Sequence, residues 1–445
     1  MKFIETCKNI WKIEDLRTRL GITLLFVLIY RFGSFIVLPG IDPTALSALH
    51  AQTAGGLMAL LDMFSGGAFS NASIFALGIM PYISASIIIQ LLTIAVPYFQ
   101  KMQQDGESGR QRMNQITRWL TVAILIIQGP SYLVNLSVQM AAVGAPIQVG
   151  WNWFTISSTI ILCAGSMFVM WLGERITDRG VGNGISFIIL IGIIARFPGA
   201  IIQEFSSRLN EGGGLMVFLA EIIILILVIA AAITLVQGTR KIPVQYAKRM
   251  VGNRQYGGVR QYIPLKVNAA NVMPIIFAQA IMFIPIMIAG FTTDGSGAFV
   301  RAFSDNNGFW YNLVFFLLII AFTYFYTAII VNPQQMAESL KQNNGFIPGV
   351  KPGKKTAEYI DTIMSRITLP GSIFLGIIAI LPAFARMFGV SMSFAQFFGG
   401  TSLLIMVGVI LDTLQQIESH LLMRHYDGFF DDGFRIKGRS GAMAY

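Results

Sequence analysis

The sequence predicts an all-α polytopic membrane protein with ten transmembrane helices in two inverted five-helix halves. Hydrophobic residues fill 54% of the 445 positions and charged residues only 12%, which is about half the charged fraction of soluble domains. Crossing the hydrocarbon takes about 20 apolar residues, and ten stretches approach or exceed that length. Composition and span length thus exclude an ordinary soluble domain. The predicted spans cover residues 20–38, 74–96, 117–138, 153–173, 184–204, 215–236, 268–290, 310–331, 367–386 and 397–421.

The distribution of basic residues predicts the orientation in the membrane. An even number of spans puts both termini on one side, and 27 of the 32 Lys and Arg residues fall in the termini and loops of that side. Cytoplasmic loops of membrane proteins carry this excess of positive charge. Both termini are therefore predicted to be cytoplasmic.

The chain begins with an amphipathic cytoplasmic segment at residues 1–19. It is charged and has no small-residue cleavage site before the first apolar run, so we do not interpret it as a cleavable signal peptide. We expect it to lie along the membrane surface. Cys7 and Cys163 are the only cysteines, one in this segment and one in the fourth span, so no disulfide framework is expected.

The stretch from Asp62 to Leu92 combines two features that rarely occur together. Glycines and serines recur between Ser65 and Ser73, and an apolar run that contains Pro81 follows directly. Lipid cannot hydrogen-bond the backbone of an interrupted helix, so such a segment must be buried in protein or face a watery cavity. We interpret it as a broken membrane helix that re-enters from the outer side, which indicates a channel or a transporter.

The two halves of the chain have equal numbers of spans and, because five is odd, opposite orientations. This is the organisation of inverted-topology repeats. The second span is interrupted in both halves, by Gly78 and Pro81 in the first and by Pro274 and Pro285 in the second. The predicted units are an N-terminal half at 20–204, a C-terminal half at 215–421 and a cytoplasmic tail at 422–445.

Two long cytoplasmic connections are predicted to be folded and basic. The loop at 237–267 has seven basic residues, no acid and an alternating apolar-polar pattern, which is typical of a β-hairpin. In the loop at 332–366, proline and glycine fix a tight tip that carries Lys351, Lys354 and Lys355. Orientation alone explains single basic residues, but not a folded loop without any acid. We expect these loops to bind RNA phosphates or an acidic protein surface.

A third cytoplasmic connection follows the fourth span. It holds Glu174, Arg175, Asp178 and Arg179 before a run of glycines. One interpretation is a tight turn in which these four charges neutralise one another. The GVGNG sequence is too short for a phosphate-binding loop, and no strand precedes it.

Nothing in the sequence predicts catalysis, a metal site or a cofactor. The three histidines have no cysteine or carboxylate at metal-ligand spacing within a span, and the common catalytic motifs are absent. Ionisable residues inside spans usually mark ion paths, yet only Arg31, Glu221 and Asp412 lie away from span ends. We expect Arg31 and Glu221 to reach water in the outer half of the membrane. This scarcity disfavours a secondary transporter of a small solute, which stays the alternative to a channel.

Isoleucines lie deep inside several spans. Lipid contact explains any one of them, but a ring contributed by several helices would form a hydrophobic constriction that excludes ions by dewetting. Three neutral polar residues, Gln90, Gln128 and Asn268, can hydrogen-bond across a helix seam, at about 0.6 kcal/mol for each bond. Such a seam is weak enough to open. The isoleucines are Ile79, Ile83, Ile87, Ile88, Ile188, Ile189, Ile275, Ile276 and Ile405.

Five sequence blocks resemble the signatures of one family. In order they read ALGIMPYISASIIIQLL, MWLGERITDRGVGNGISFII, YAKR with YIPLKVN, NGFIPGVKPGKKTAEYID and FFGGTSLLIMVGVILD. They are similar to successive blocks of the SecY family, the channel subunits of the bacterial protein-translocation complex, and the similarity runs from about Trp11 to Met423. The resemblance implies two pseudo-symmetric five-helix halves around a central pore. Unfolded secretory polypeptides would cross through the pore, while signal sequences and transmembrane segments would leave sideways into the lipid bilayer.

The resemblance also implies roles for individual residues. The pore ring would consist of Ile79, Ile83, Ile189, Ile276 and Ile405. The plug would be a short re-entrant helix within residues 57–73, including Met63, Phe64, Ser65, Gly66 and Gly67. The lateral gate, where spans two and three face spans seven and eight, would include Ser84, Gln90, Gln128, Asn268 and Ile284.

The resemblance implies partners as well, in the bacterial inner (cytoplasmic) membrane. SecE and SecG would be the small membrane subunits, and the two basic loops would dock the SecA motor ATPase or the ribosome, through its RNA and proteins. The family usually has arginine in the tip motif PG-x-R-PG, whereas this chain has Lys351, which keeps the charge but loses the planar bidentate fork. The implied docking residues are Arg240, Lys241, Lys248, Arg249, Arg254 and Lys351.

Overall fold

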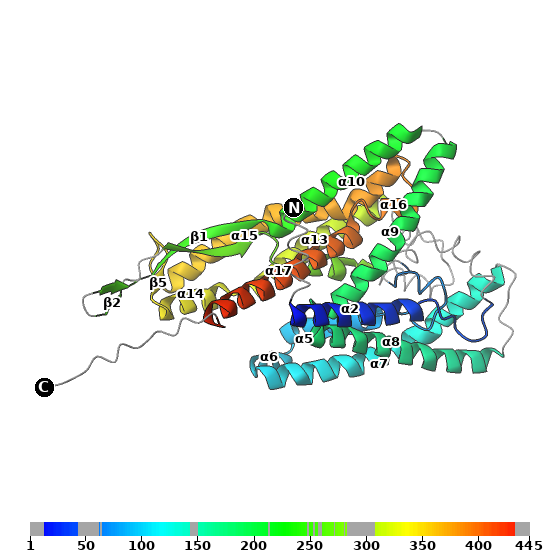
Figure 1. Cartoon of the computed structure of the whole chain (residues 1–445), viewed down its shortest axis with the longest axis horizontal. Coiled ribbons are helices and arrows are strands. Elements are labelled where there is room, and N and C mark those ends of the chain that lie inside the picture. Colours follow the sequence, from blue (N-terminus) through cyan, green and yellow to red (C-terminus); the bar gives the residue numbers. More distant parts are fainter. Residues whose placement is uncertain are drawn as a thin grey trace.

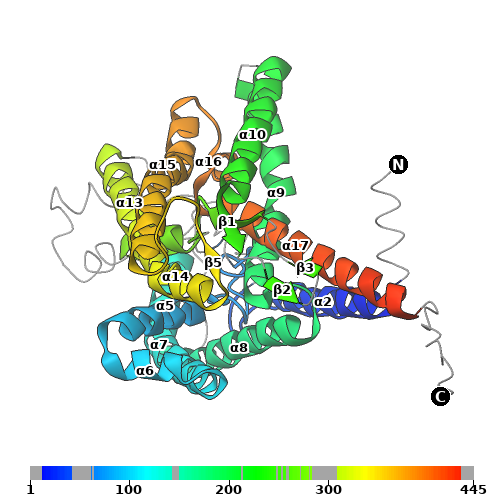
Figure 2. The same ribbon diagram turned by 90° about the vertical axis from the view of Figure 1, so that its left-hand side faces the viewer.

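The computed structural model describes residues 13–42, 62, 65–142, 150–211, 214–246, 249–251, 254–256, 260–270, 272–279, 281–282 and 308–431. Two groups of helices lie side by side, and α9 (Gly184–Glu211) runs between them (Figure 1). Figure 2 shows the same division from one end. The first group is α2 (Glu14–Gly33), α5 (Met80–Ala95), α6 (Pro97–Gln104), α7 (Glu107–Ala142) and α8 (Trp151–Arg179). The second is α10 (Gly214–Gln237), α13 (Phe309–Ile330), α14 (Pro333–Gln342), α15 (Lys354–Met387), α16 (Met392–Ala395) and α17 (Gly400–Asp431).

The helix lengths agree with the predicted membrane fold. In the described part of the chain, seven helices are long and apolar enough to cross a membrane, and an eighth span is present if α5 and α6 count as one. The helix α2 is apolar only between Arg19 and Arg31, and the predicted span at 268–290 is described no further than residue 282. Large apolar side chains of α10, among them Met216, Ile223 and Leu227, are exposed as lipid contact requires.

The predicted second span differs from the structure at both ends. Helix α5 begins at Met80 instead of residue 74, because the backbone before it forms tight turns with positive φ at Gly66, Gly67 and Gly78. At its other end α5 stops at Ala95, and Pro97 opens α6 at an angle of 102°, in the first-turn position that proline favours. The connection between the predicted second and third spans, which end at 96 and begin at 117, is mostly helical, because α6 and the start of α7 occupy it.

One apolar core extends through both groups of helices. Its buried side chains come from α2, α8 and α9 on one side and from α10, α13, α15 and α17 on the other. A second cluster, around Tyr132, Leu136 and Phe154, packs inside the first group. The two groups are therefore held together mainly by apolar packing. Two groups packed in this way can separate and close again without leaving charged side chains unpaired.

The two basic loops fold together into a small domain at one end of the molecule. Strand β1 (Thr239–Tyr246) pairs antiparallel with β4 (Arg260–Lys266) and, on its other edge, with β5 (Gly345–Phe346). This confirms the predicted hairpin. Its tip continues as the short pair β2 (Arg249–Val251) and β3 (Arg254–Tyr256). Alternating residues Ile242 and Val244 of β1 face a core completed by α14 and the start of α15.

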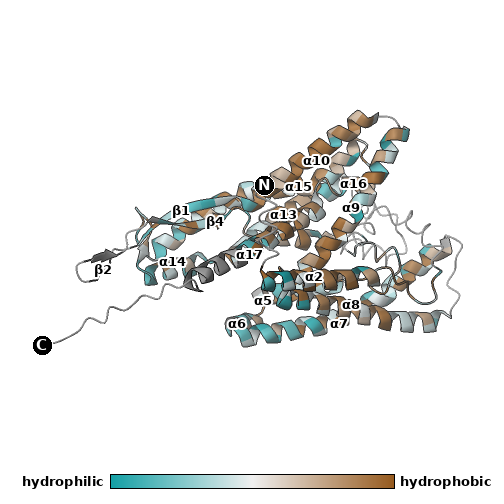
Figure 3. Ribbon diagram, in the orientation of Figure 1, coloured by the Kyte–Doolittle hydropathy of each residue, from teal (hydrophilic) through white to brown (hydrophobic). Residues whose placement is uncertain are grey.

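Hydropathy separates this domain from the membrane helices (Figure 3). Strand β1 and helices α6 and α14 are largely hydrophilic, whereas α10 and α13 are hydrophobic along most of their length. Exposed tryptophans lie near helix ends, Trp153 at the start of α8 and Trp310 at the start of α13. Tryptophan is enriched at the membrane–water boundary, so these residues mark where the hydrocarbon ends opposite the β-sheet.

Candidate functional site: ring, plug segment and gate

The structure brings the five predicted ring isoleucines into one apolar cluster. Ile79 immediately precedes α5, Ile189 lies on α9, and Ile405 lies on α17; they are 3%, 5% and 3% exposed. Ile83 on α5 and Ile276 on the helical segment 273–279 pack against the same cluster and are partly buried. Four separate segments of the chain therefore contribute these side chains to the apolar core that extends through both helix groups.

The predicted plug is described at Asp62 and from Ser65 onward, so Met63 and Phe64 lie outside the described residues. Between Ser65 and residue 79 the backbone forms turns, held by side chains of the surrounding helices. The Tyr30 hydroxyl donates to the Ser65 carbonyl at 3.0 Å, and the Arg31 guanidinium donates to the Gly66 carbonyl at 2.8 Å. From α7, the Tyr132 hydroxyl donates to the Phe69 carbonyl at 2.9 Å.

Glycine is required at position 66 for two reasons. Its φ of +64° lies in the left-handed region, which side chains rarely adopt. A Cβ atom there would also lie 2.7 Å from Gly192 Cα and 2.9 Å from Arg31 Nη1. The plug segment can thus press its backbone directly against α9.

An ion pair anchors the start of this segment to α9. The Asp62 carboxylate is 2% exposed and pairs with the Arg196 guanidinium. Its Oδ1 accepts from the Ser70 backbone N–H at 2.8 Å, and Arg196 Nη2 also donates to Ser70 Oγ at 3.0 Å. The sequence alone did not identify Arg196 as a partner of Asp62, although an arginine within an apolar helix is a signal for a nearby acid.

At the candidate gate, a hydrogen bond connects the two groups of helices. The Tyr326 hydroxyl of α13 donates to Gln90 Oε1 of α5, and Gln90 Nε2 donates to Ser86 Oγ at 3.5 Å. The Tyr326 ring packs on Phe277 with centroids 5.2 Å apart. Sequence reasoning missed Tyr326, since a tyrosine in an apolar span has no distinctive local pattern.

The other predicted gate residues that the structure describes lie on α5, on α7 and just before the 273–279 helix. Ser84 is on α5 and Gln128 on α7, both partly exposed, and Asn268 is 2% exposed just before the 273–279 helix. Ile284 lies outside the described residues. Ile87, Ala270 and Phe277 fill the seam between α5 and the second group.

A buried ionic cluster fixes the α9–α10 pair to the turn that follows α15. Arg208 Nε donates to Glu204 Oε1 at 2.9 Å, and Arg208 Nη2 donates to Glu221 Oε1 at 2.5 Å. The Ser391 backbone N–H donates to Glu204 Oε2 at 2.9 Å. The expectation that Glu221 reaches water is wrong, because Arg208 compensates its charge inside the protein and leaves it 6% exposed. Arg31 is partly exposed, and its guanidinium also donates to the plug segment.

The glycine-rich turn after α8 makes different contacts from those expected. Glu174 pairs with Arg118 of α7 through two hydrogen bonds of 3.1 and 2.7 Å, and Arg175 lies over the Trp171 ring. Mutual neutralisation within the turn is therefore wrong for Glu174, because the neighbouring helix supplies a bidentate partner. The Gly182 N–H donates to Gln416 Oε1 at 3.0 Å, which ties this turn to α17.

The predicted docking residues lie on the β-sheet domain. Arg240 and Lys241 on β1 and Lys351 at the tip of the 332–366 loop are exposed. Arg249 begins β2 and Arg254 begins β3, while Lys248 lies outside the described residues. The Thr356 hydroxyl donates to the Lys351 carbonyl at 2.9 Å, so the backbone of the tip is fixed whatever side chain it carries. No group of three potential metal ligands occurs among the described residues.

Comparison with known proteins identifies the family. The sequence pattern that defines SecY matches residues 73–414. The chain belongs to the SecY family. The protein translocase subunit SecY of Streptomyces galbus is 43% identical over 94% of this chain and 98% of its own. That of Mycobacterium tuberculosis strain H37Rv is also 43% identical, over 93% of this chain and 97% of its own.

Solved structures confirm the all-α channel fold. A structure described as a protein-conducting channel superposes with a TM-score of 0.61, at 17% identity, over 93% of this chain and 95% of that one. Sec61 in the canine ribosome-channel complex gives a TM-score of 0.57 at 16% identity, over 93% of this chain and 95% of that one. The resemblance of the five sequence blocks to SecY is therefore confirmed.

Proposed function

We propose that this chain is the protein-conducting subunit of a bacterial Sec translocon, in its closed conformation. Unfolded secretory polypeptides pass between the isoleucines of the ring, and transmembrane segments leave through the seam at Gln90 and Tyr326. The observation that carries the proposal is that one apolar core holds or contacts Ile79, Ile83, Ile189, Ile276 and Ile405, which come from four segments of both helix groups. An apolar constriction of this kind excludes ions while it is closed and has no fixed affinity for any side chain that passes.

The plug segment supports the closed state from the outer side of the ring. The residues from Asp62 to Gly78 lead directly into Ile79, and Arg31, Tyr132 and Arg196 hold them. Because these bonds hold the segment through its own backbone and Asp62, opening would release it as a unit. One related structure is described as showing that the SecY plug domain stabilises the closed channel and maintains a membrane seal.

The partners that drive translocation and deliver the polypeptide bind at the β-sheet domain. Its exposed basic residues suit an acidic protein surface or RNA phosphates, and we assign it to SecA and the ribosome. Relatives of this fold have been observed in ribosome complexes, as canine Sec61 and as the yeast Ssh1 complex. SecE and SecG complete the membrane assembly, both termini are cytoplasmic, and the chain itself catalyses no reaction.

Reconstitution tests this function. Proteoliposomes that contain the chain, SecE, SecG and SecA should protect a secretory polypeptide from external protease only when ATP is supplied. Liposomes with the chain alone should accumulate no small solute against a gradient. Solute uptake by the chain alone, without polypeptide transport by the assembly, would favour the transporter.

A further inference from the structure

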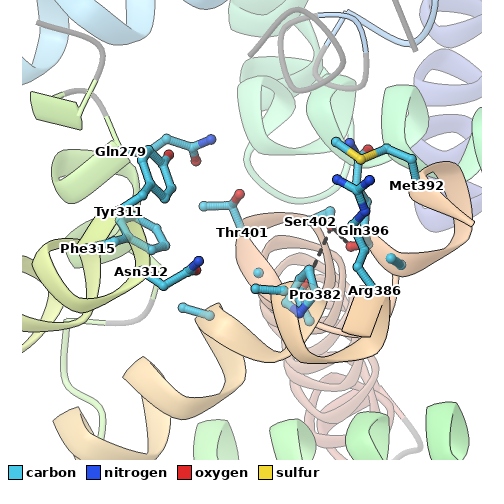
Figure 4. Close-up of a pocket in the computed structure, with 15 residues that line it drawn as sticks. Gln279, Tyr311, Asn312, Phe315, Pro382, Arg386, Met392, Gln396, Thr401 and Ser402 are labelled. Carbon is cyan, nitrogen blue, oxygen red and sulfur yellow. Dashed lines mark hydrogen bonds between the residues drawn. The ribbon is translucent and has the colours of Figure 1, made fainter. Parts of the chain in front are cut away.

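A cavity lies in the second helix group (Figure 4), near the end of α15 that is remote from the β-sheet domain. It has a volume of about 90 Å³, and since a void of this kind needs about 10–15 Å³ for one water, it can hold several waters or a small polar group. Four elements supply the walls: the 273–279 helix, α13, the end of α15, and the turn from α16 into α17. The principal polar lining residues are Gln279, Tyr311, Asn312, Arg386, Gln396 and Thr401.

The lining has a positive charge and no negative one. Arg386 is partly buried, and no Asp or Glu lines the cavity. Within the part of the chain that the structure describes, Arg386 forms no ion pair. A partly buried guanidinium forms charge-assisted hydrogen bonds with carboxylate or phosphate oxygens, so the cavity favours an anion.

A buried amide faces the same space. Gln279 is 6% exposed and lines the cavity, yet its side chain has no hydrogen-bond partner among the described residues. Buried amides are almost always hydrogen-bonded. Thr401, on the opposite wall near the start of α17, is 5% exposed. Figure 4 shows Gln279 and Tyr311 on one side of the view, Arg386 and Gln396 on the other, and Thr401 between them.

The position of the cavity indicates where its ligand comes from. Arg386 lies at the end of α15, and the next two residues, Met387 and Phe388, are 82% and 81% exposed. Trp310, at the start of α13, is 61% exposed. Exposed apolar side chains beside an exposed tryptophan mark the headgroup level of a membrane. The cavity therefore lies at the depth where lipid phosphates are found.

We propose that this cavity binds the headgroup of an anionic, hydroxyl-bearing phospholipid from the leaflet opposite the β-sheet domain. Arg386 pairs with the phosphodiester, and the amides of Gln279 and Gln396 hydrogen-bond the hydroxyls. A choline headgroup fits poorly because its trimethylammonium group would lie near Arg386 and can donate no conventional hydrogen bond. The helix faces that carry Gln279 and Thr401 also carry Ile276 and Ile405, three and four residues away, so the bound lipid contacts two ring-bearing segments.

The proposal favours lipid over a passing polypeptide. A carboxylate-binding site beside the constriction would retain every acidic side chain that crosses, at a position where release must be fast. The exposed apolar residues around Arg386 would have no role for a soluble segment, whereas acyl chains cover them.

Lipid titration of the purified full-length assembly tests the proposal. Native mass spectrometry would measure binding of dioctanoyl phosphatidylglycerol, dioctanoyl phosphatidylcholine and inorganic phosphate. We expect phosphatidylglycerol to bind best, and Arg386→Gln and Gln279→Leu each to weaken it about tenfold, the size expected for one charge-assisted or buried hydrogen bond. Arg366→Gln, which changes an exposed arginine in the first half of α15, should bind like the unmodified chain. Arg386→Lys should retain most of the affinity, which separates charge loss from misfolding.

Three results would overturn the assignment. Equal phosphatidylglycerol binding by the Arg386→Gln variant and the unmodified chain would show that the lipid does not bind in this cavity. Inorganic phosphate that binds as tightly, with the same loss in Arg386→Gln, would make it a free-anion site. Displacement of phosphatidylglycerol by an equal concentration of an acidic peptide would assign it to polypeptide.

Discussion

The Tyr326 hydroxyl on α13 donates a hydrogen bond to Gln90 Oε1 on α5, and the two residues are 236 positions apart in the sequence. They belong to opposite helix groups. Around them the seam is filled by apolar side chains such as Ile87 and Phe277. A single hydrogen bond in an apolar seam can align the two helix groups in the closed state. It is weak enough to break when an apolar segment enters the seam and makes its own contacts there.

Removing this bond should ease opening of the gate. Tyr326→Phe deletes the hydroxyl and retains the ring packed on Phe277. Hydrogen bonds between membrane helices average about 0.6 kcal/mol, so the closed state should lose about threefold in its equilibrium with the open one. Polypeptides with a less apolar signal sequence should then be transported faster. Tyr324→Phe is the matched control, because its bond to the Ser365 carbonyl, at 3.4 Å, stays within the second helix group.

Breaking the Asp62–Arg196 pair should loosen the plug segment. Removing one partner of a buried pair costs about 3–5 kcal/mol, and we expect the low end because the Arg196 side chain is 34% exposed. Arg196→Gln should be more severe than Asp62→Asn, since it leaves the carboxylate buried with only the Ser70 N–H. Ion conductance of the resting channel in planar bilayers measures the effect.

The double variant separates this ion pair from general damage. Asp62→Asn combined with Arg196→Gln removes both charges, so its resting conductance should be lower than that of Arg196→Gln alone. Simple addition of the two single effects would show that the residues act independently and that the pair does not hold the plug segment.

A charge in the ring should break the seal against ions. Ile276→Glu places a carboxylate at a position that packs against the apolar cluster, so water enters with it and dewetting fails. We expect a resting ionic current in planar bilayers. Ile276→Leu should stay tight, because volume-conserving swaps usually cost less than about 1.5 kcal/mol. A tight Ile276→Glu channel would count heavily against the ring assignment.

Reversing the charge of Lys351 should weaken partner binding without unfolding the domain. The side chain is exposed, and the Thr356 hydroxyl bonds only its carbonyl. Lys351→Glu should reduce SecA or ribosome affinity about tenfold at low salt, with less effect at high salt. Lys351→Arg should bind at least as well, because arginine adds a bidentate fork. Arg110→Glu, an exposed reversal on α7, controls for net charge.

Local sequence patterns were sufficient for most of the fold. Runs of apolar residues identified the spans, and the alternation of apolar and polar residues identified the β1–β4 hairpin. Both patterns depend only on which environment surrounds a single segment. The turns before Met80 were predicted only as an interruption, since glycine permits positive φ without specifying where it occurs. The addition of β5 to the hairpin joins two loops about a hundred residues apart in the sequence, and no local signal encodes it.

The sequence pointed to the apolar residues of the candidate site, but not to the partners in its ion pairs and hydrogen bonds. The isoleucines carry a family pattern, and the structure gathers them in one cluster. Arg196, Tyr326 and Arg118 were not assigned to Asp62, Gln90 and Glu174, because each partner comes from a distant helix. The charge of an arginine in an apolar helix signals that a partner exists, but only the packing of helices identifies it.

Cross-linking a stalled polypeptide to the ring tests the central claim most directly. In a chain with Cys7 and Cys163 replaced by serine, a cysteine would be introduced by Ile405→Cys or, as a lipid-facing control, by Ile224→Cys on α10, where the isoleucine is 50% exposed. A secretory polypeptide with one cysteine, halted midway through transport, should form a disulfide with position 405 and not with position 224. Full transport with cross-links at 224 and none at 405 would contradict passage through the ring.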